Sequence, residues 1–270
     1  MSTILDNYPI VSSLPVRACD EVTTGSGNSD YPWAKFDPEA YFQHYYGDPH
    51  ADDDCVARLA TEAIKRMPQT GNDLDVIDIG TGPNLIPFLC ASPRARSLTA
   101  WEFSASNIAW LEAELKRDAL RPQWQHFWDV SRSAYGPDWQ LPDNPMASLI
   151  AKSIVTRGSI FDLPQCRWDG ATMFFCAESI TGQLDEFEAA MSAFAKCVKP
   201  GGTLAAAFLV QSDGYEVGGR RFPALRLSAG QIEAVLACHA HSVKTERIGI
   251  VDEEIRSGYS GCAFVTAVAR

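Results

Sequence analysis

Short apolar runs alternate along the chain with longer segments whose apolar residues recur every three or four positions. The run 75–80, DVIDIG, is short and ends at a glycine, which is typical of a buried strand followed by a tight turn. The segment 104–117 places Ile108, Leu111 and Leu115 on one face of a helix. Strands that alternate with helices predict β-α-β units and therefore an α/β fold with a doubly wound sheet.

The same pattern predicts the other strands. They are expected at 75–80, 97–103, 151–160, 170–176, 203–210, 242–251 and 261–268, with a hairpin over 214–222. The region 122–150 is harder to interpret. Trp124, Phe127 and Trp128 fit one helical face there, and we expect them in the core or in a pocket wall.

Two helices are predicted near the N-terminus. Asp37 can serve as the N-cap of the first helix and Pro38 as its first residue, and this helix should end near Gly47. The second helix should span 51–67, where apolar residues recur at helical spacing.

The domain organisation follows from composition along the chain. Residues 23–30 are polar and rich in Gly and Ser, so 1–35 is expected to be a flexible N-terminal segment. No repeat and no linker divides the rest. We therefore expect a single domain over 36–270, in which 36–68 form a helical lid.

Charge narrows the classes of partner. The 270 residues include 23 Lys and Arg against 34 Asp and Glu, a formal net charge of −11, and no basic run occurs. A nucleic-acid or anionic-membrane partner is therefore not expected. The chain also lacks an apolar stretch of transmembrane length and a basic N-terminal leader, so we expect a cytoplasmic protein.

The cysteines and histidines indicate neither a metal site nor a hydrolase. The eight cysteines are dispersed without a C-x-x-C pair, and most lie in apolar runs, which is typical of small buried side chains. No H-E-x-x-H motif or Ser–His–Asp arrangement is visible. No metal is expected.

The strongest local signal is the loop Asp78-Ile79-Gly80-Thr81-Gly82, which follows a strand and precedes a helix. Glycines at such a junction let a ligand approach the backbone. The next strand ends in Glu102, whose carboxylate could accept hydrogen bonds from both hydroxyls of an adenosine ribose.

Two ligand classes fit this loop. A dinucleotide fold usually carries G-x-G-x-x-G, but the third glycine position is Leu85 here, and a pyrophosphate would disfavour the nearby Asp78. S-adenosylmethionine has no phosphate, and its amine and sulfonium favour nearby carboxylates. The motif alone leaves both classes open, and Asp78 could simply brace the loop.

Four sequence segments and a hairpin, spread over most of 36–270, together carry a more specific pattern. They read FDPEAYFQHYY (36–46), DVIDIGTGP (75–83), LTAWEFSASNIAWLEAEL (98–115), FFCAESITGQLDEFEAAMSAFAKCVKPGGTL (174–204) and GYEVGGRRF (214–222). In this order they resemble the methyltransferase family that contains nicotinamide, phenylethanolamine and indolethylamine N-methyltransferases, here as a bacterial-type small-molecule member. The aromatic pattern of the first segment is the most specific part of the resemblance.

The resemblance implies a Rossmann-like methyltransferase fold with a seven-stranded, mostly parallel sheet whose last strand is antiparallel, and S-adenosylmethionine as the cofactor. Tyr41 and Tyr46 would close over the donor, and Phe103 would lie against the adenine. The donor-binding residues that it implies are Tyr41, Tyr46, Asp78, Gly80, Thr81, Gly82, Asn84, Glu102, Phe103, Asn107, Ser159, Ile160 and Phe174.

The resemblance also implies an acceptor pocket. Its expected residues are Tyr41, Phe175, Glu178, Phe208, Leu209, Ser212 and Tyr215. Glu178 aligns with the acid that contacts the acceptor in family members, and it is the catalytic candidate, either as a base or as a binding group. Burial in an aromatic pocket would raise its pKa toward a useful value. His44, beside the lid, is a less favoured base.

Two departures from the family pattern bear on specificity. Family members often bind the adenine amino group with an Asp where this chain has Gly158-Ser159-Ile160, so Ser159 or Asp162 is expected to replace it. Phe208 stands where the nicotinamide enzyme has an acceptor-side Asp. The loss of that charge favours a larger, more apolar aromatic acceptor over nicotinamide.

The sequence therefore predicts an S-adenosylmethionine-dependent methyltransferase that acts on a small aromatic acceptor of the indole or arylalkylamine type. Methylation on N, C or O is left open, and a monomer with a role in secondary metabolism is expected. The alternatives are a regulatory protein that binds S-adenosylmethionine without catalysis and a nicotinamide-dinucleotide oxidoreductase.

Overall fold

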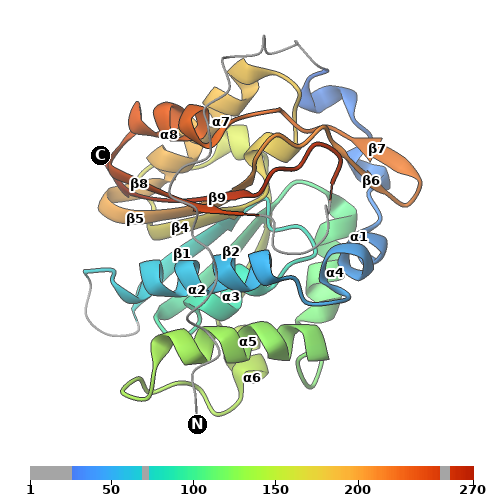
Figure 1. Ribbon diagram of the computed structural model, residues 1–270. Helices are drawn as coiled ribbons and strands as arrows, with labels where there is room; N and C mark the ends of the chain where they lie inside the picture. The colour runs from blue at the N-terminus through green and yellow to red at the C-terminus, as the bar shows by residue number, and fades with distance from the viewer. Residues whose placement is uncertain (1–25, 69–72, 250–255) are drawn as a thin grey trace.

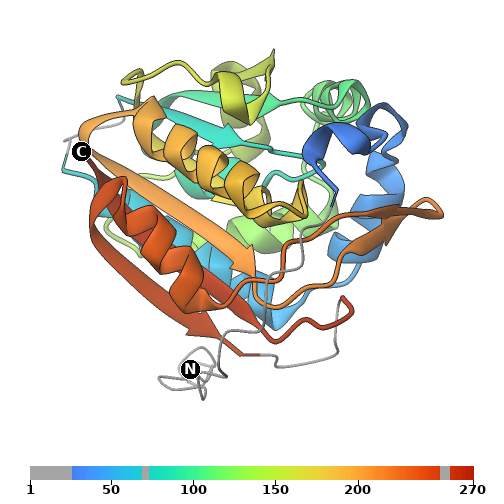
Figure 2. The same cartoon turned by 90° about the horizontal axis from the view of Figure 1, so that it is seen from above.

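A seven-stranded sheet lies between two layers of helices in the computed structural model (Figure 1). The structure describes residues 26–68, 73–249 and 256–270. The strand order in the sheet is β3-β2-β1-β4-β5-β9-β8. Seen from above, α7 and α8 lie side by side over one face of the sheet (Figure 2).

The strands confirm the expected doubly wound sheet. They are β1 Leu74–Ile79, β2 Ala95–Glu102, β3 Ser153–Arg157, β4 Trp168–Phe174, β5 Val198–Leu209, β8 Ala240–Ile248 and β9 Cys262–Ala269. Strands β1 to β5 pair in parallel, and β9 runs antiparallel to both β5 and β8. The expected hairpin is present as β6 Tyr215–Val217 and β7 Arg220–Phe222.

Each face of the sheet buries its own apolar cluster. One face is covered by α2 Ala51–Lys65, α3 Ile86–Ala91, α4 Ala105–Glu114, α5 Pro122–Tyr135 and α6 Pro145–Lys152, and the other by α7 Leu184–Cys197 and α8 Ala229–Ala237. Trp124, Phe127 and Trp128 are buried in the first cluster, which confirms them as core residues.

The first helix begins where its capping residues predict. In α1 Pro38–Tyr46, the carboxylate of Asp37 accepts a 3.0 Å hydrogen bond from the backbone N–H of Ala40. Arg121 ties this helix to its neighbours, because its guanidinium donates to Glu39 on α1 and to Glu114 on α4. The helix is thereby held at the carboxyl ends of β1 and β2.

Part of the N-terminal segment is regular, unlike the flexible stretch expected over 1–35. Residues 1–25 lie outside the described residues, but η1 Asn28–Asp30 and η2 Trp33–Lys35 are 3₁₀ turns. Trp33 packs on Phe222 of the hairpin with ring centroids 5.2 Å apart. A long aromatic side chain that finds an apolar partner can order a segment that its polar neighbours would leave free.

The lid expected over 36–68 divides into two parts with different surroundings. Helix α1 lies beside α4 and the hairpin, whereas α2 packs on α3 and α5 as a member of a helical layer (Figure 1). An amphipathic helix with apolar residues on one face buries that face wherever the sheet offers a surface. Most of α2 is therefore part of the layer that covers the sheet, whereas α1 lies next to α4 and the hairpin.

One strand is shorter than expected. The strand predicted over 151–160 is β3, and α6 occupies the residues before it. Asn144 caps α6 by accepting a 3.0 Å hydrogen bond from the N–H of Ala147, and Pro145 is the first helical residue. The strand predicted over 242–251 corresponds to β8. Residues 250 and 251 of the predicted strand lie outside the described part of the chain.

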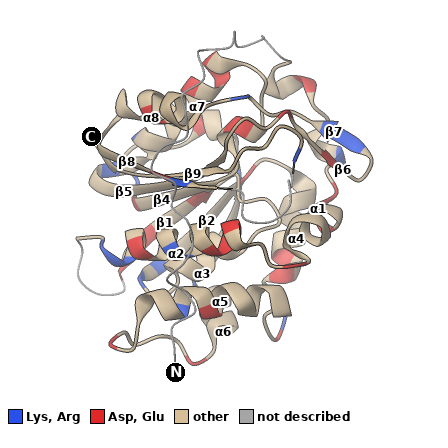
Figure 3. Cartoon of the chain, in the orientation of Figure 1, with Lys and Arg blue, Asp and Glu red and all other residues tan. Residues whose placement is uncertain are grey.

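Charged residues are spread over the helices and loops around the sheet, and the hairpin carries Arg220 and Arg221 (Figure 3). Within the described residues, no helix is long and apolar enough to cross a membrane.

Candidate functional site

A large cleft opens at the carboxyl ends of β1, β2, β3 and β4. Its volume is about 830 Å³, counting the part that is open to solvent. Its lining is Asn28, Trp33, Phe36, Tyr41, Tyr46, Gly80–Asn84, Trp101–Ser104, Asn107, Gly158–Phe161, Phe174–Cys176, Ser179, Ile180 and Tyr215. In open α/β sheets this edge is where ligands bind.

The glycine loop forms the floor of this cleft. Gly80 has a φ of +63°, and a Cβ there would lie 2.1 Å from the Sγ of Cys176. Only glycine fits that position, since both the backbone conformation and the close approach exclude a side chain. The hydroxyl of Thr81 donates to the carbonyl of Asp78 over 3.1 Å and fixes the turn.

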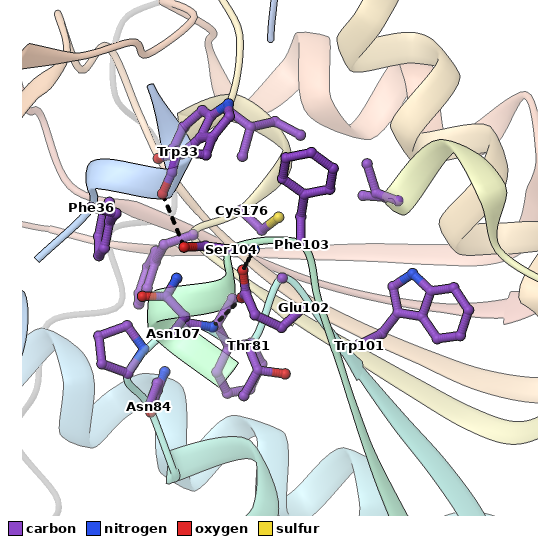
Figure 4. Close-up of a pocket in the computed structure, with 18 of the residues that line it drawn as sticks. Trp33, Phe36, Thr81, Asn84, Trp101, Glu102, Phe103, Ser104, Asn107 and Cys176 are labelled. Carbon is purple, nitrogen blue, oxygen red and sulfur yellow. Dashed lines mark hydrogen bonds between the residues drawn. The ribbon is translucent and has the colours of Figure 1, made fainter. Parts of the chain in front are cut away.

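Glu102 presents its carboxylate to the cleft from the end of β2 (Figure 4). Its two oxygens accept backbone N–H bonds from Gly82 at 2.8 Å and from Ser104 at 2.7 Å. Burial raises the pKa of this carboxyl group, and those hydrogen bonds oppose the shift. Carboxylate oxygens have further lone pairs, so Glu102 can still accept hydrogen bonds from a ligand.

Asn107 offers a second acceptor to the same ligand. Its Oδ1 is buried and has no hydrogen-bond partner among the described residues, although the side chain lines the cleft. A buried acceptor without a partner costs free energy, so this oxygen is suited to a hydroxyl or amine of a bound molecule.

The cleft lining includes apolar residues that follow β2 and β3 in sequence. They are Phe103, Ile160 and Phe161, and Phe103 is 49% exposed. The indole N–H of Trp101 donates to the carbonyl of Ser159 over 2.9 Å and fixes the loop after β3. Ser159 lines the cleft, so it is the better placed of the two residues expected to replace the family Asp; Asp162 does not line it.

Asp78 does not line the cleft, although it was expected among the donor-binding residues. It is buried under the loop, where its Oδ1 accepts a 2.7 Å hydrogen bond from the hydroxyl of Thr172 on β4. Burial raises its pKa to about 7. The hydrogen bond to Thr172, together with the one from Thr81 to the Asp78 carbonyl, agrees with the alternative that Asp78 braces the loop.

A second cavity, of about 520 Å³ with its open part, adjoins the cleft. It is lined by Tyr41, Tyr45, Tyr46, His50, Asp52, Asp53, Phe175, Leu209, Arg256 and Cys262. Tyr41, Tyr46 and Phe175 line both spaces and therefore form a shared aromatic wall. A molecule in the cleft and another in the second cavity would meet at this wall.

Phe175 reaches the wall through an uncommon backbone conformation. It follows the last residue of β4 with a φ of +54°, and its N–H donates to the carbonyl of Ala207 over 2.7 Å. A bulky residue in the left-handed region is strained and is found preferentially at functional sites.

Glu178 lines neither space. It is fully buried, and its Oε1 accepts a 2.9 Å hydrogen bond from the N–H of Leu209. Its Oε2 has no hydrogen-bond partner in the described part of the chain. Burial raises the pKa of Glu178 to about 7. The expected catalytic carboxyl group therefore holds the backbone of a residue that lines the second cavity, but does not line the cavity itself.

The other residues expected in the acceptor pocket do not all line it, because neighbouring residues of a strand face opposite sides of the sheet. Leu209 lines the second cavity, whereas Phe208 points to the opposite face of β5 and packs on Phe187. Phe208 is therefore a core residue and no pocket wall. Ser212 is buried outside both spaces, and Tyr215 lines the cleft.

Several lining residues were not anticipated from the sequence. Asp53 and His50 come from the start of α2, Arg256 from the segment before β9, and Trp33 from η2. Acids in the first turn of a helix are common because they interact with the helix dipole, so the sequence gives no reason to single out Asp53. His44, the less favoured base, is exposed and lines neither space.

The described residues contain no group of three His, Cys, Asp or Glu that could hold a metal ion.

Residues 26–268 match the model of the NNMT/PNMT/TEMT family. The chain belongs to this family.

Three N-methyltransferases from mammals match most of this chain. Rat phenylethanolamine N-methyltransferase is 22% identical over 244 residues, 84% of either chain. Mouse indolethylamine N-methyltransferase is 23% identical over 252 residues, covering 89% of this chain and 95% of the relative. Human nicotinamide N-methyltransferase is 24% identical over 223 residues, covering 79% and 84%.

Solved structures of methyltransferases share the fold. Magnesium protoporphyrin IX methyltransferase from Synechocystis PCC 6803, with bound S-adenosylmethionine, superposes with a TM-score of 0.52 at 13% identity, covering 86% of this chain and 90% of that one. Phosphoethanolamine N-methyltransferase 2 from Haemonchus contortus gives 0.54 at 12% identity, covering 86% and 56%.

Membership confirms the enzyme class and the cofactor. The family consists of methyltransferases that act on small molecules and use S-adenosylmethionine. The cleft fits that cofactor, because Glu102 and Asn107 offer acceptors for a nucleoside and the loop at Gly82, where the nearest atom to an added Cβ is 3.9 Å away, leaves room against the backbone.

Proposed function

We propose that the protein transfers a methyl group to a small aromatic acceptor held in the second cavity, with the donor in the large cleft. The observation that carries this proposal is the aromatic wall of Tyr41, Tyr46 and Phe175, which lines both spaces. Methyl transfer is a displacement that chiefly needs alignment and exclusion of water, and a shared wall serves both needs.

The lining of the second cavity supports the class of acceptor. Four of its side chains, Tyr41, Tyr45, Tyr46 and Phe175, are aromatic, and rings of this kind pack against a ring of the acceptor. An indole or an arylalkylamine fits this description, methylated on N, C or O. A role in secondary metabolism accords with such an acceptor.

On the donor side, this chain's own groups would do the binding. S-adenosylmethionine supplies an activated methyl group on its sulfonium. Glu102 would accept hydrogen bonds from the ribose hydroxyls, and Phe103 and Ile160 would enclose the adenine. Asn84, Thr81 and the loop glycines, which also line the cleft, would hold the amino-acid part.

On the acceptor side, the geometry favours Asp53 over Glu178 as the group in contact with the acceptor. Asp53 lines the second cavity, is only 9% exposed, and accepts no side-chain hydrogen bond from the described residues. Burial raises its pKa to about 8, so it can take up a proton near neutral pH. Glu178 would act as a positioning residue, since it holds the backbone of Leu209.

The first test measures binding of S-adenosylhomocysteine by calorimetry. The second measures turnover, as the formation of S-adenosylhomocysteine from S-adenosylmethionine in the presence of a panel of indoles, arylalkylamines and phenols. We expect binding in the wild type and turnover with at least one acceptor. Asp53→Asn should lower kcat with donor affinity retained, and Glu112→Ala on the exposed face of α4 is the matched control.

The outcomes separate the alternatives. Donor binding without turnover on any aromatic acceptor would favour a regulatory protein that holds S-adenosylmethionine. Unchanged turnover in Asp53→Asn would remove that residue from the acceptor site. We also propose a monomer, which light scattering tests. The cytoplasmic location stays a prediction.

A further inference from the structure

Arg256 carries a buried positive charge into the second cavity. The side chain lines that cavity and is only 5% exposed. Its guanidinium donates to the hydroxyl of Ser179 over 3.1 Å and to that of Tyr41 over 3.4 Å. It also stacks on two rings, at 4.1 Å from the centroid of Tyr215 and 5.0 Å from that of Tyr45.

All of these partners are neutral. Among the described residues no carboxylate lies within 4.0 Å of the Arg256 guanidinium, and its Nε is buried without a hydrogen-bond partner. A buried charge is costly unless it is paired, and hydroxyls and ring faces compensate only in part. The planar guanidinium matches the two oxygens of a carboxylate.

The nearest acids do not neutralise this charge by contact. Asp53 and Glu178 are close enough for Arg256 to oppose the rise in their pKa values, but burial still leaves those values at about 8 and about 7. Both acids therefore hold protons over part of the neutral range, when Arg256 remains charged.

We propose that Arg256 is an anion-binding subsite of the acceptor pocket and that the acceptor is a ring compound that bears a carboxylate. This inference rests on the proposed function, because it specifies the acceptor of the same site. A monoanion fits better than a phosphate, since of the other lining residues only His50 could add positive charge.

The donor also carries a carboxylate, and Ser179, Tyr41 and Tyr215, which Arg256 contacts, line the cleft, but the Arg256 side chain itself faces the other space. Arg256 lines the second cavity and does not line the cleft, where Gly80, Thr81 and Asn84 lie. The relatives are named for phenylethanolamine, an indolethylamine and nicotinamide, none of which has a carboxylate. The subsite would thus separate this chain's acceptor from theirs.

The test uses matched pairs of acid and amide on three scaffolds. The probes are indole-3-acetate and indole-3-acetamide, phenylacetate and phenylacetamide, and tryptophan and tryptophanamide. Each is titrated by calorimetry into the protein saturated with S-adenosylhomocysteine. We expect at least one acid to bind about tenfold tighter than its amide, which is the usual size of one charged hydrogen-bonded contact.

Variants assign that preference to Arg256. Arg256→Gln should weaken the acid at least about tenfold more than the amide, and Arg256→Lys should recover part of the difference. Arg226→Gln, at an exposed Arg outside both cavities, is the control. S-adenosylhomocysteine affinity in Arg256→Gln should fall by less than the affinity for the acid, since Arg256 touches residues of the cleft lining but does not itself line the cleft.

The two proposals fail in different ways. If S-adenosylhomocysteine does not bind at all, the proposed function is wrong. If it binds but no acid is preferred on any scaffold, including the case in which none of the acids binds, the subsite is wrong and the proposed function stands. An equal loss of acid and amide binding in both Arg256 variants would mean that Arg256 only supports the local packing.

Discussion

The backbone N–H of Gly82 donates a 2.8 Å hydrogen bond to Oε2 of Glu102, which ties the loop after β1 to the last residue of β2. The other oxygen of Glu102 accepts from the N–H of Ser104 at 2.7 Å. Both carboxylate oxygens are therefore held in place before a ligand arrives. Preorganised acceptors bind with less loss of side-chain entropy.

Glu102→Ala should weaken binding of S-adenosylhomocysteine by about 30-fold, or about 2 kcal/mol, because two charge-assisted hydrogen bonds to the ribose would be lost. Calorimetry measures this. Glu112→Ala, at an exposed position of α4, should leave the affinity unchanged. Equal affinities in the wild type and Glu102→Ala would remove Glu102 from the donor site.

Gly80→Ala should destabilise the protein far more than Gly82→Ala. Both positions have a positive φ, +63° and +59°, so each alanine carries a backbone cost of about 1–2 kcal/mol. At Gly80 the new methyl group would also collide with the Sγ of Cys176, whereas at Gly82 the nearest atom is 3.9 Å away. Urea denaturation should show a difference of at least about 1 kcal/mol, and Cys176→Ala should reduce it.

Arg121→Gln should lower the free energy of unfolding by about 2–3 kcal/mol, because it leaves Glu114, which is buried, with one fewer cation. It should also weaken donor binding, since the freed Glu39 no longer anchors α1, which carries Tyr41 and Tyr46. Arg66→Gln breaks an exposed pair with Glu62 and should cost less than about 0.5 kcal/mol. Similar losses in both variants would contradict this account.

Stability should fall as the pH rises from about 4 to about 8. Folding raises the pKa of Glu178 from 4.5 to about 7, so between these values the folded protein keeps a proton that the unfolded chain has released. The contribution of Glu178 is thus fully present below about pH 4.5 and is lost by about pH 7. Asp53 and Asp78 act in the same direction.

Glu178→Gln should flatten this pH dependence. Relative to the wild type, the variant should gain about 3 kcal/mol between pH 4.5 and pH 7.5, as expected for a shift of this size. Urea titrations at four pH values measure it, with Glu112→Gln as the control for loss of an exposed charge. Parallel curves for the wild type and Glu178→Gln would show that Glu178 does not hold its proton in the folded state.

Features that depend on local sequence could be predicted. The cap at Asp37, the tight turn at Gly80 and the acid at the end of β2 each follow from neighbouring residues, and each is present. The alternation of strands and helices likewise specified a parallel sheet. These features are encoded within a few residues of one another, so a single sequence suffices to recognise them.

The acceptor side could not be predicted in the same way. Asp53 and Arg256 are 203 positions apart and meet only because α2 and the segment before β9 pack beside the same aromatic wall. Phe208 and Leu209 were both expected in the pocket, but adjacent strand residues face opposite sides, and the phase of β5 was not known from the sequence.

The shared aromatic wall also determines whether the acceptor preference can change while the donor affinity stays the same. A substitution at Tyr41, Tyr46 or Phe175 changes both spaces at once, so an altered acceptor preference there comes with altered donor affinity. Leu209 and Cys262 line only the second cavity. Directed evolution toward new acceptors should therefore accumulate its changes at positions such as these, which line the second cavity alone, while the three aromatic residues stay fixed.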